Sequence, residues 1–112
     1  MKVDPQTTPP TVNDIPLTQR IKASWRKTMG EQIFDENYRR LGMGAEDFPF
    51  LTINPYIPST YFAVGGTPAA AFAAEKNGGP AVPSHHSPLF KIDPEPAIRT
   101  GVEATVNALF EL

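Results

Sequence analysis

Two neighbouring histidines, His85 and His86, are the residues of this chain best suited to chemistry. They are the only histidines in the sequence, and they lie between Pro83 and Pro88. Because proline fixes φ at about −65° and donates no backbone hydrogen bond, residues 83–90 are predicted to form an ordered loop, not a helix or a central strand. Two interpretations remain open: the imidazoles bind a metal ion, or the loop is a polar turn whose histidines cap backbone groups.

The adjacency of the two histidines limits what they do together. Neighbouring side chains on an extended backbone point in opposite directions, so we expect at most one imidazole to face a given site. We therefore expect that His85 and His86 do not easily share one ion. A catalytic zinc site typically has three protein ligands and an open position, so this chain is not expected to complete one alone. It has no cysteine, and it shows neither a serine nucleophile elbow nor a phosphate-binding glycine loop.

A second candidate stretch begins with Gly42 and Gly44, which flank Met43, and continues with two acids, Glu46 and Asp47. Glycine permits a tight turn or a close approach of the backbone to a ligand. Two acids after a glycine turn are more often the start of a helix than a catalytic pair. A short helix that ends before Pro49 or near Leu51 is therefore the alternative to a site.

Helices are predicted in three places. Asp14 or Asn13 is expected to cap a helix with Pro16 in its first turn and Gly30 at its end. An apolar residue recurs at every fourth position of that helix: Leu17, Ile21, Trp25 and Met29. Residues 68–76 are expected to form two helical turns. The last helix is expected to follow Asp93 and run to the C-terminus, with an apolar stripe of Ile98, Val102, Val106, Leu109 and Phe110.

The fold class depends on residues 60–64, a continuous apolar and β-prone run between Pro58 and Gly65. This pattern predicts a strand buried on both faces of a parallel or mixed sheet. Residues 32–34 are a candidate for a shorter strand. Helix, strand and helix in this order predict the α/β class, and close packing on the sheet would explain Gly101 inside the last helix.

The composition excludes several classes of function. The chain has 112 residues and a formal net charge of −2, from 10 basic and 12 acidic side chains spread along the sequence. The sequence has no basic patch of the kind that marks a nucleic-acid-binding surface. No apolar run approaches the ~20 residues that a membrane span needs, and no apolar signal core follows Met1. A cytoplasmic protein without a membrane or nucleic-acid partner is the expectation.

Three short motifs resemble one enzyme family. Residues 43–48 (Met-Gly-Ala-Glu-Asp-Phe) resemble a signature of the metal-dependent amidohydrolases that include hippurate hydrolase, N-acyl-amino-acid aminoacylases and plant auxin-conjugate hydrolases. Residues 86–93 (His-Ser-Pro-Leu-Phe-Lys-Ile-Asp) resemble the C-terminal motif of that family, which belongs to the zinc carboxypeptidase and aminoacylase superfamily. Residues 9–14 resemble the point at which the chain of a family member leaves the lid domain and re-enters the catalytic domain.

The resemblance implies a function that this chain would share with missing partners. Family members hold two metal ions, with zinc favoured here, and hydrolyse amides of N-acyl amino acids or peptides. By the match, His86 is a metal ligand, and His85 stands where the family often has an apolar residue. Gly44, Glu46 and Asp47 would help to shape the substrate pocket and support the metal ligands. The other ligands and the base glutamate have no counterpart here, so the isolated chain is predicted to be inactive.

The resemblance also implies a domain organisation. Residues 1–14 would be a connector from a lid domain that precedes them, and residues 15–112 would be the C-terminal segment of a three-layer, zinc-peptidase-like catalytic domain. Apolar faces uncovered by the missing parts would favour a homo-oligomer. Two alternatives stay open: a small non-catalytic α/β binding or structural module, and a related enzyme that acts on dipeptides or carboxypeptidase substrates.

Overall fold

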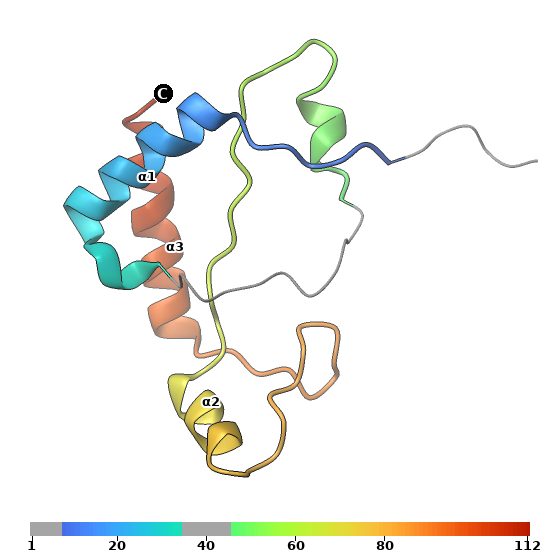
Figure 1. The fold of residues 1–112 in the computed structure, drawn as a ribbon, viewed down its shortest axis with the longest axis vertical. Coiled ribbons are helices and arrows are strands. Elements are labelled where there is room, and N and C mark those ends of the chain that lie inside the picture. The colour runs from blue at the N-terminus through green and yellow to red at the C-terminus, as the bar shows by residue number, and fades with distance from the viewer. Residues whose placement is uncertain (1–7, 35–45) are drawn as a thin grey trace, which may run out of the picture. The chain divides into compact units, whose positions relative to one another are not determined.

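The computed structural model describes residues 8–34 and 46–112, which contain three α-helices: α1 (Ile15–Met29), α2 (Ala69–Lys76) and α3 (Pro94–Leu109) (Figure 1). Two short 3-10 helices span Glu31–Ile33 and Phe48–Leu51. The chain divides into two compact units. One comprises Met1–Phe62 together with Asn107–Leu112, and the other comprises Ala63–Val106.

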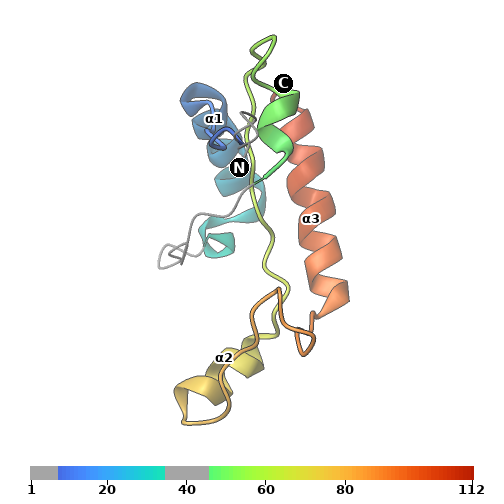
Figure 2. The same cartoon turned by 90° about the vertical axis from the view of Figure 1, so that its right-hand side faces the viewer.

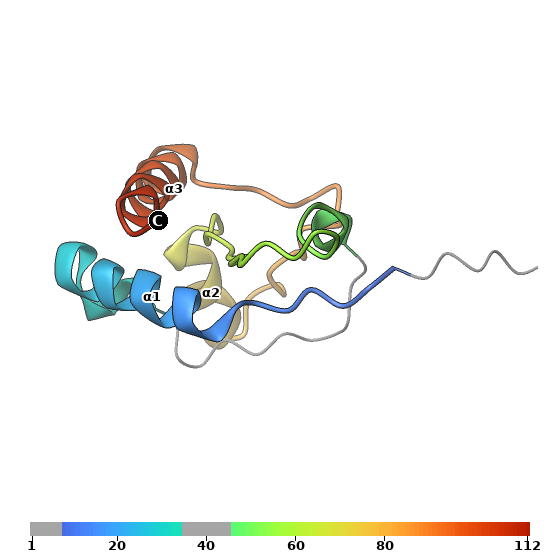
Figure 3. The same cartoon turned by 90° about the horizontal axis from the view of Figure 1, so that it is seen from above.

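Helix α1 begins and ends at residues that the sequence marks. Asp14 is the N-cap, and its Oδ1 accepts a hydrogen bond from the Leu17 N–H at 2.9 Å. Pro16 lies in the first turn, where its missing N–H has no helical partner to lose. The helix ends at Gly30, whose φ of 87° is a conformation that glycine adopts readily. Figure 3 shows the extended chain running into the first turn of α1.

The core of the first unit is the apolar stripe of α1. Leu17, Ile21 and Trp25 are buried, each exposed by 7% or less. The Trp25 ring meets the Phe62 ring edge-on, with centroids 4.9 Å apart, and it lies 6.5 Å from the Phe34 ring. Edge-to-face pairs at such distances contribute about 0.5–1.5 kcal/mol beyond the burial of their area. The predicted helix and its buried face are confirmed.

The predicted strand at 60–64 is wrong. The segment runs extended but forms no ladder (Figure 2). Tyr61, Phe62 and Val64 are each exposed by 37–39%. Along one edge of this extended segment, the Asp14 N–H donates to the Ser59 carbonyl at 2.9 Å. The amide of Asn13 then brackets Tyr61: it accepts from the Tyr61 N–H at 2.8 Å and donates to the Tyr61 carbonyl at 2.9 Å.

This pairing cannot lengthen into a sheet, because the paired segment, residues 13–14, becomes helical at Ile15. Across the described residues there is no strand, only an isolated bridge between Ile53 and Tyr56. The α/β class and the helix–strand–helix layout of a three-layer domain are therefore wrong, and the described chain is helical. The strand considered at 32–34 is also wrong, since the 3-10 helix Glu31–Ile33 occupies most of it.

The second unit confirms the remaining helices. Helix α2 stops before Gly78, whose φ is 84°. Helix α3 follows Asp93, whose N–H donates to the Gly66 carbonyl at 2.8 Å. Gly101 does not need close packing on a sheet, because a Cβ added there would meet only Val64 Cγ2 at an ordinary 3.9 Å. None of the helices in the described chain combines the length and hydrophobicity needed to cross a membrane.

The apolar stripe of α3 does not face a core. Ile98, Val102, Val106 and Leu109, here called the α3 stripe, are exposed by 45–64%. The buried residue of this helix is Ala104, which lies about 150° around the axis from the stripe at 100° per residue. The periodicity therefore predicts the helix correctly but not which of its faces is covered.

The burial of Trp25 generates a first prediction. Trp25→Ala should destabilise the chain by about 3–5 kcal/mol, because it leaves a cavity among the few buried side chains. Urea unfolding followed by far-ultraviolet circular dichroism measures this loss. The matched control is Phe110→Ala at a residue exposed by 84%, which should change the free energy of unfolding by less than about 0.5 kcal/mol. Equal effects of the two substitutions would contradict the assigned core.

The cap of α1 generates a second prediction. The Leu17 N–H, and next the Tyr56 hydroxyl at 2.8 Å, hydrogen-bond the Asp14 carboxylate and hold its pKa below the ordinary 3.8. The same bond to Asp14 raises the pKa of Tyr56. Since the folded-state pKa of Asp14 is lowered, its ionised form stabilises the fold above pH 3.8, and this contribution is lost as the pH falls through the lowered pKa.

Asp14→Asn keeps a side-chain acceptor for the Leu17 N–H but carries no charge. The wild-type chain should unfold at a higher urea concentration than this variant at pH 7, and the difference should vanish in acid. Asp47→Asn is the control, since the Asp47 side chain makes no cap hydrogen bond, and it should have little effect at pH 7. A difference between wild type and Asp14→Asn that stays constant into acid would show that the charge of Asp14 is not involved.

Candidate functional site

Residues 77–93, here called the histidine loop, join α2 to α3 within the second unit and contain neither helix nor strand (Figure 1). Its central feature is a β-turn in which the Ser87 N–H donates to the Ser84 carbonyl at 2.8 Å. His85 and His86 are the two central residues of that turn. The predicted loop is confirmed, with a defined turn at its tip.

The turn places the two imidazole rings in contact. Their centroids are 4.4 Å apart, and their planes are inclined by 78°. The expectation that the two side chains point in opposite directions is therefore wrong. That expectation assumed an extended backbone, whereas the central residues of a β-turn reverse the chain direction. Both histidines are exposed.

Hydrogen bonds on both sides hold the turn to its surroundings. The Leu89 N–H donates to Ser87 Oγ at 3.1 Å, and the Phe90 N–H donates to the Ser87 carbonyl at 3.0 Å. On the other side, the Val82 N–H donates to Glu75 Oε1 at 3.1 Å and so ties the loop to α2. The imidazole pair thus projects from a loop with several fixed backbone positions.

The other predicted site residues lie in the first unit or outside the described residues. Gly44 falls in the segment that the structure does not describe. Glu46 is half-buried, and Asp47 is exposed. Asp47 is the N-cap of the 3-10 helix Phe48–Leu51, and its carbonyl accepts from the Phe50 N–H at 3.1 Å. The alternative of a short helix that ends at residue 51 is therefore confirmed, and any role of the two acids in binding stays a prediction.

No group of three or more histidine, cysteine, aspartate or glutamate side chains suited to hold a metal ion occurs in residues 8–34 and 46–112. The histidine pair supplies two imidazoles at one place, and the described chain adds no third ligand to them. A metal-binding role of His86 stays a prediction.

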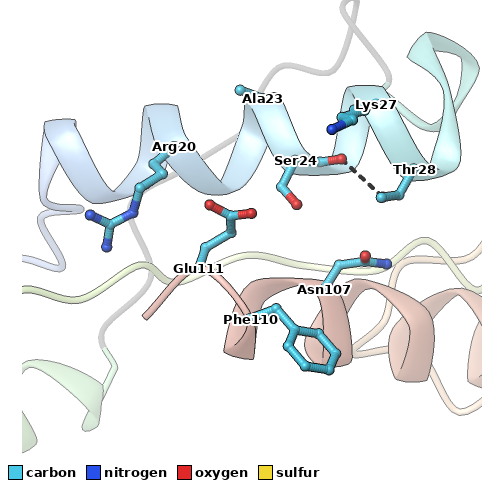
Figure 4. Close-up of a pocket in the computed structure, with 8 residues that line it drawn as sticks. All are labelled: Arg20, Ala23, Ser24, Lys27, Thr28, Asn107, Phe110 and Glu111. Atoms are coloured by element: carbon cyan, nitrogen blue, oxygen red, sulfur yellow. Dashed lines mark hydrogen bonds between the residues drawn. The ribbon is translucent and has the colours of Figure 1, made fainter.

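A shallow hollow in the first unit was not predicted from the sequence. It has a volume of about 450 Å³ and is lined by Arg20, Ala23, Ser24, Lys27, Thr28, Asn107, Phe110 and Glu111. In Figure 4 the Glu111 carboxylate points toward α1, into the space between Arg20 and Ser24. Arg20, Ser24 and Lys27 are spaced by four and three residues, a pattern that places them on one helix face and was the available signal. The hollow gathers charges of both signs within the first unit.

Comparisons of the chain with protein-family models, with curated proteins and with solved structures gave no match. The resemblance to the amidohydrolases therefore depends on the short motifs alone.

Proposed function

We propose that this chain supplies the histidine-bearing part of a metal-dependent hydrolase that cleaves amide bonds of N-acyl amino acids or peptides. The observation that carries this proposal is the motif at 86–93, whose His86 is exposed at the tip of a hydrogen-bonded turn. An exposed imidazole on a fixed turn is accessible to an ion that other protein groups hold. The chain alone is proposed to be inactive.

A divalent metal ion, with zinc favoured and two ions in the complete enzyme, belongs to this proposal. When bound, such an ion polarises a carbonyl and activates water. The role of His86 is to hold the ion through one ring nitrogen. Gly44, Glu46 and Asp47 keep their proposed role in substrate binding.

The α3 stripe supports the part of the proposal that involves other protein surface. Its four apolar side chains are exposed by 45–64%, and contiguous exposed apolar surface usually marks a protein contact. We accordingly propose that the chain associates, either with the rest of the hydrolase or as a homo-oligomer. The cytoplasm is the proposed compartment.

The proposal is tested by co-expressing the chain with the product of any neighbouring reading frame that encodes further histidine and acidic metal ligands. The pair should hydrolyse N-acetyl amino acids in a zinc-dependent reaction, whereas the chain alone should not. His86→Ala in the pair should lower kcat/KM by at least about 100-fold, since even groups that only orient metal ligands contribute 10–100-fold.

Lys91→Ala is the matched control, because Lys91 lies in the same motif and is exposed, and it should leave turnover unchanged. Turnover by the isolated chain, or an active pair that is insensitive to His86→Ala, would contradict the proposal. The lack of any such reading frame would count against it as well, and would favour a non-catalytic binding module.

A further inference from the structure

We propose that His85 and His86 together form a two-imidazole site for Cu²⁺ or Ni²⁺. The site depends only on the geometry of the loop, so it does not require the hydrolase function proposed above. Both side chains are exposed, and their ring centroids lie 4.4 Å apart. Neutral imidazole is a good ligand for both ions.

The distance between the rings fits one shared ion. A metal–nitrogen bond of about 2.0–2.1 Å places an ion about 3.2 Å from the centroid of the imidazole that binds it. Two rings with centroids 4.4 Å apart then subtend an angle of about 90° at an ion that both rings bind.

The turn supplies much of the preorganisation that such a site needs. The bond from the Ser87 N–H to the Ser84 carbonyl fixes the backbone on both sides of the histidines. Each ring still has to aim one nitrogen at the ion. It can do so by rotation about the Cβ–Cγ bond, which has a broad energy profile in histidine. Binding then orders few additional torsions, which favours affinity.

The angle at the ion selects the metal. Neighbouring ligands in a square-planar or tetragonal site are about 90° apart, and this geometry is typical of Cu²⁺ and Ni²⁺. Zinc sites are almost always tetrahedral, with angles of about 109°. The general order of affinities for divalent ions also places Cu²⁺ first. We therefore expect Cu²⁺ to bind more tightly than Ni²⁺, and Ni²⁺ more tightly than Zn²⁺, with water as the remaining ligand.

The test is titration of the full 112-residue chain with Cu²⁺ by isothermal calorimetry in a buffer that contains free glycine as a competitor. One ion should bind per chain. His85→Ala and His86→Ala should each weaken binding by about 100-fold, because a single imidazole loses the advantage of two linked ligands. Electron paramagnetic resonance of the copper complex should show two imidazole nitrogens in the wild type and one in each single variant.

Lys91→Ala is the control on the same loop, and circular dichroism of each variant checks that the helices persist. Wild-type affinity in His85→Ala, or a signal from one imidazole nitrogen in the wild-type complex, would overturn the proposal. Unchanged affinity in a variant that carries both His85→Ala and His86→Ala would place the bound ion elsewhere and would overturn the proposal too. These outcomes are independent of the hydrolase proposal, because no turnover is measured.

Discussion

The hydrogen bond from the Ser87 N–H to the Ser84 carbonyl decides what the histidine pair can do. On an extended backbone two adjacent imidazoles diverge and act separately. The turn instead brings their rings to a centroid distance of 4.4 Å. The two proposals for this loop use the turn differently: the hydrolase proposal needs only the exposed His86, and the copper or nickel site needs both imidazoles side by side.

A second constraint is how little apolar surface the described chain buries. Its buried hydrophobic residues are Leu17, Ile21, Trp25 and Ala104, whereas the large side chains of the α3 stripe stay exposed. Burial of apolar area is the main favourable contribution to folding. A helix with exposed Ile and Val side chains therefore gains stability when a further surface covers it.

Local signals in the sequence predicted local structure well. Asp14 and Gly30 set the ends of α1 because a side-chain acceptor and a residue tolerant of positive φ act within one turn of the helix. The period of the α3 stripe likewise predicted its helix. What covers that stripe could not be predicted, because periodicity shows which residues share a face and not what lies against it.

Two wrong expectations, the strand at 60–64 and the diverging histidines, have separate physical causes. Residues 60–64 have the composition of a strand, but a strand needs a ladder, and the pairing with Asn13 and Asp14 ends where α1 begins. The contact between His85 and His86 depends on a backbone turn that residue types alone did not fix.

Solution nuclear magnetic resonance of the chain tests that turn most directly. The account predicts nuclear Overhauser contacts between the two imidazole rings and slow exchange of the Ser87 amide proton. Rings without mutual contacts, together with a Ser87 amide that exchanges as fast as in an unfolded peptide, would contradict it.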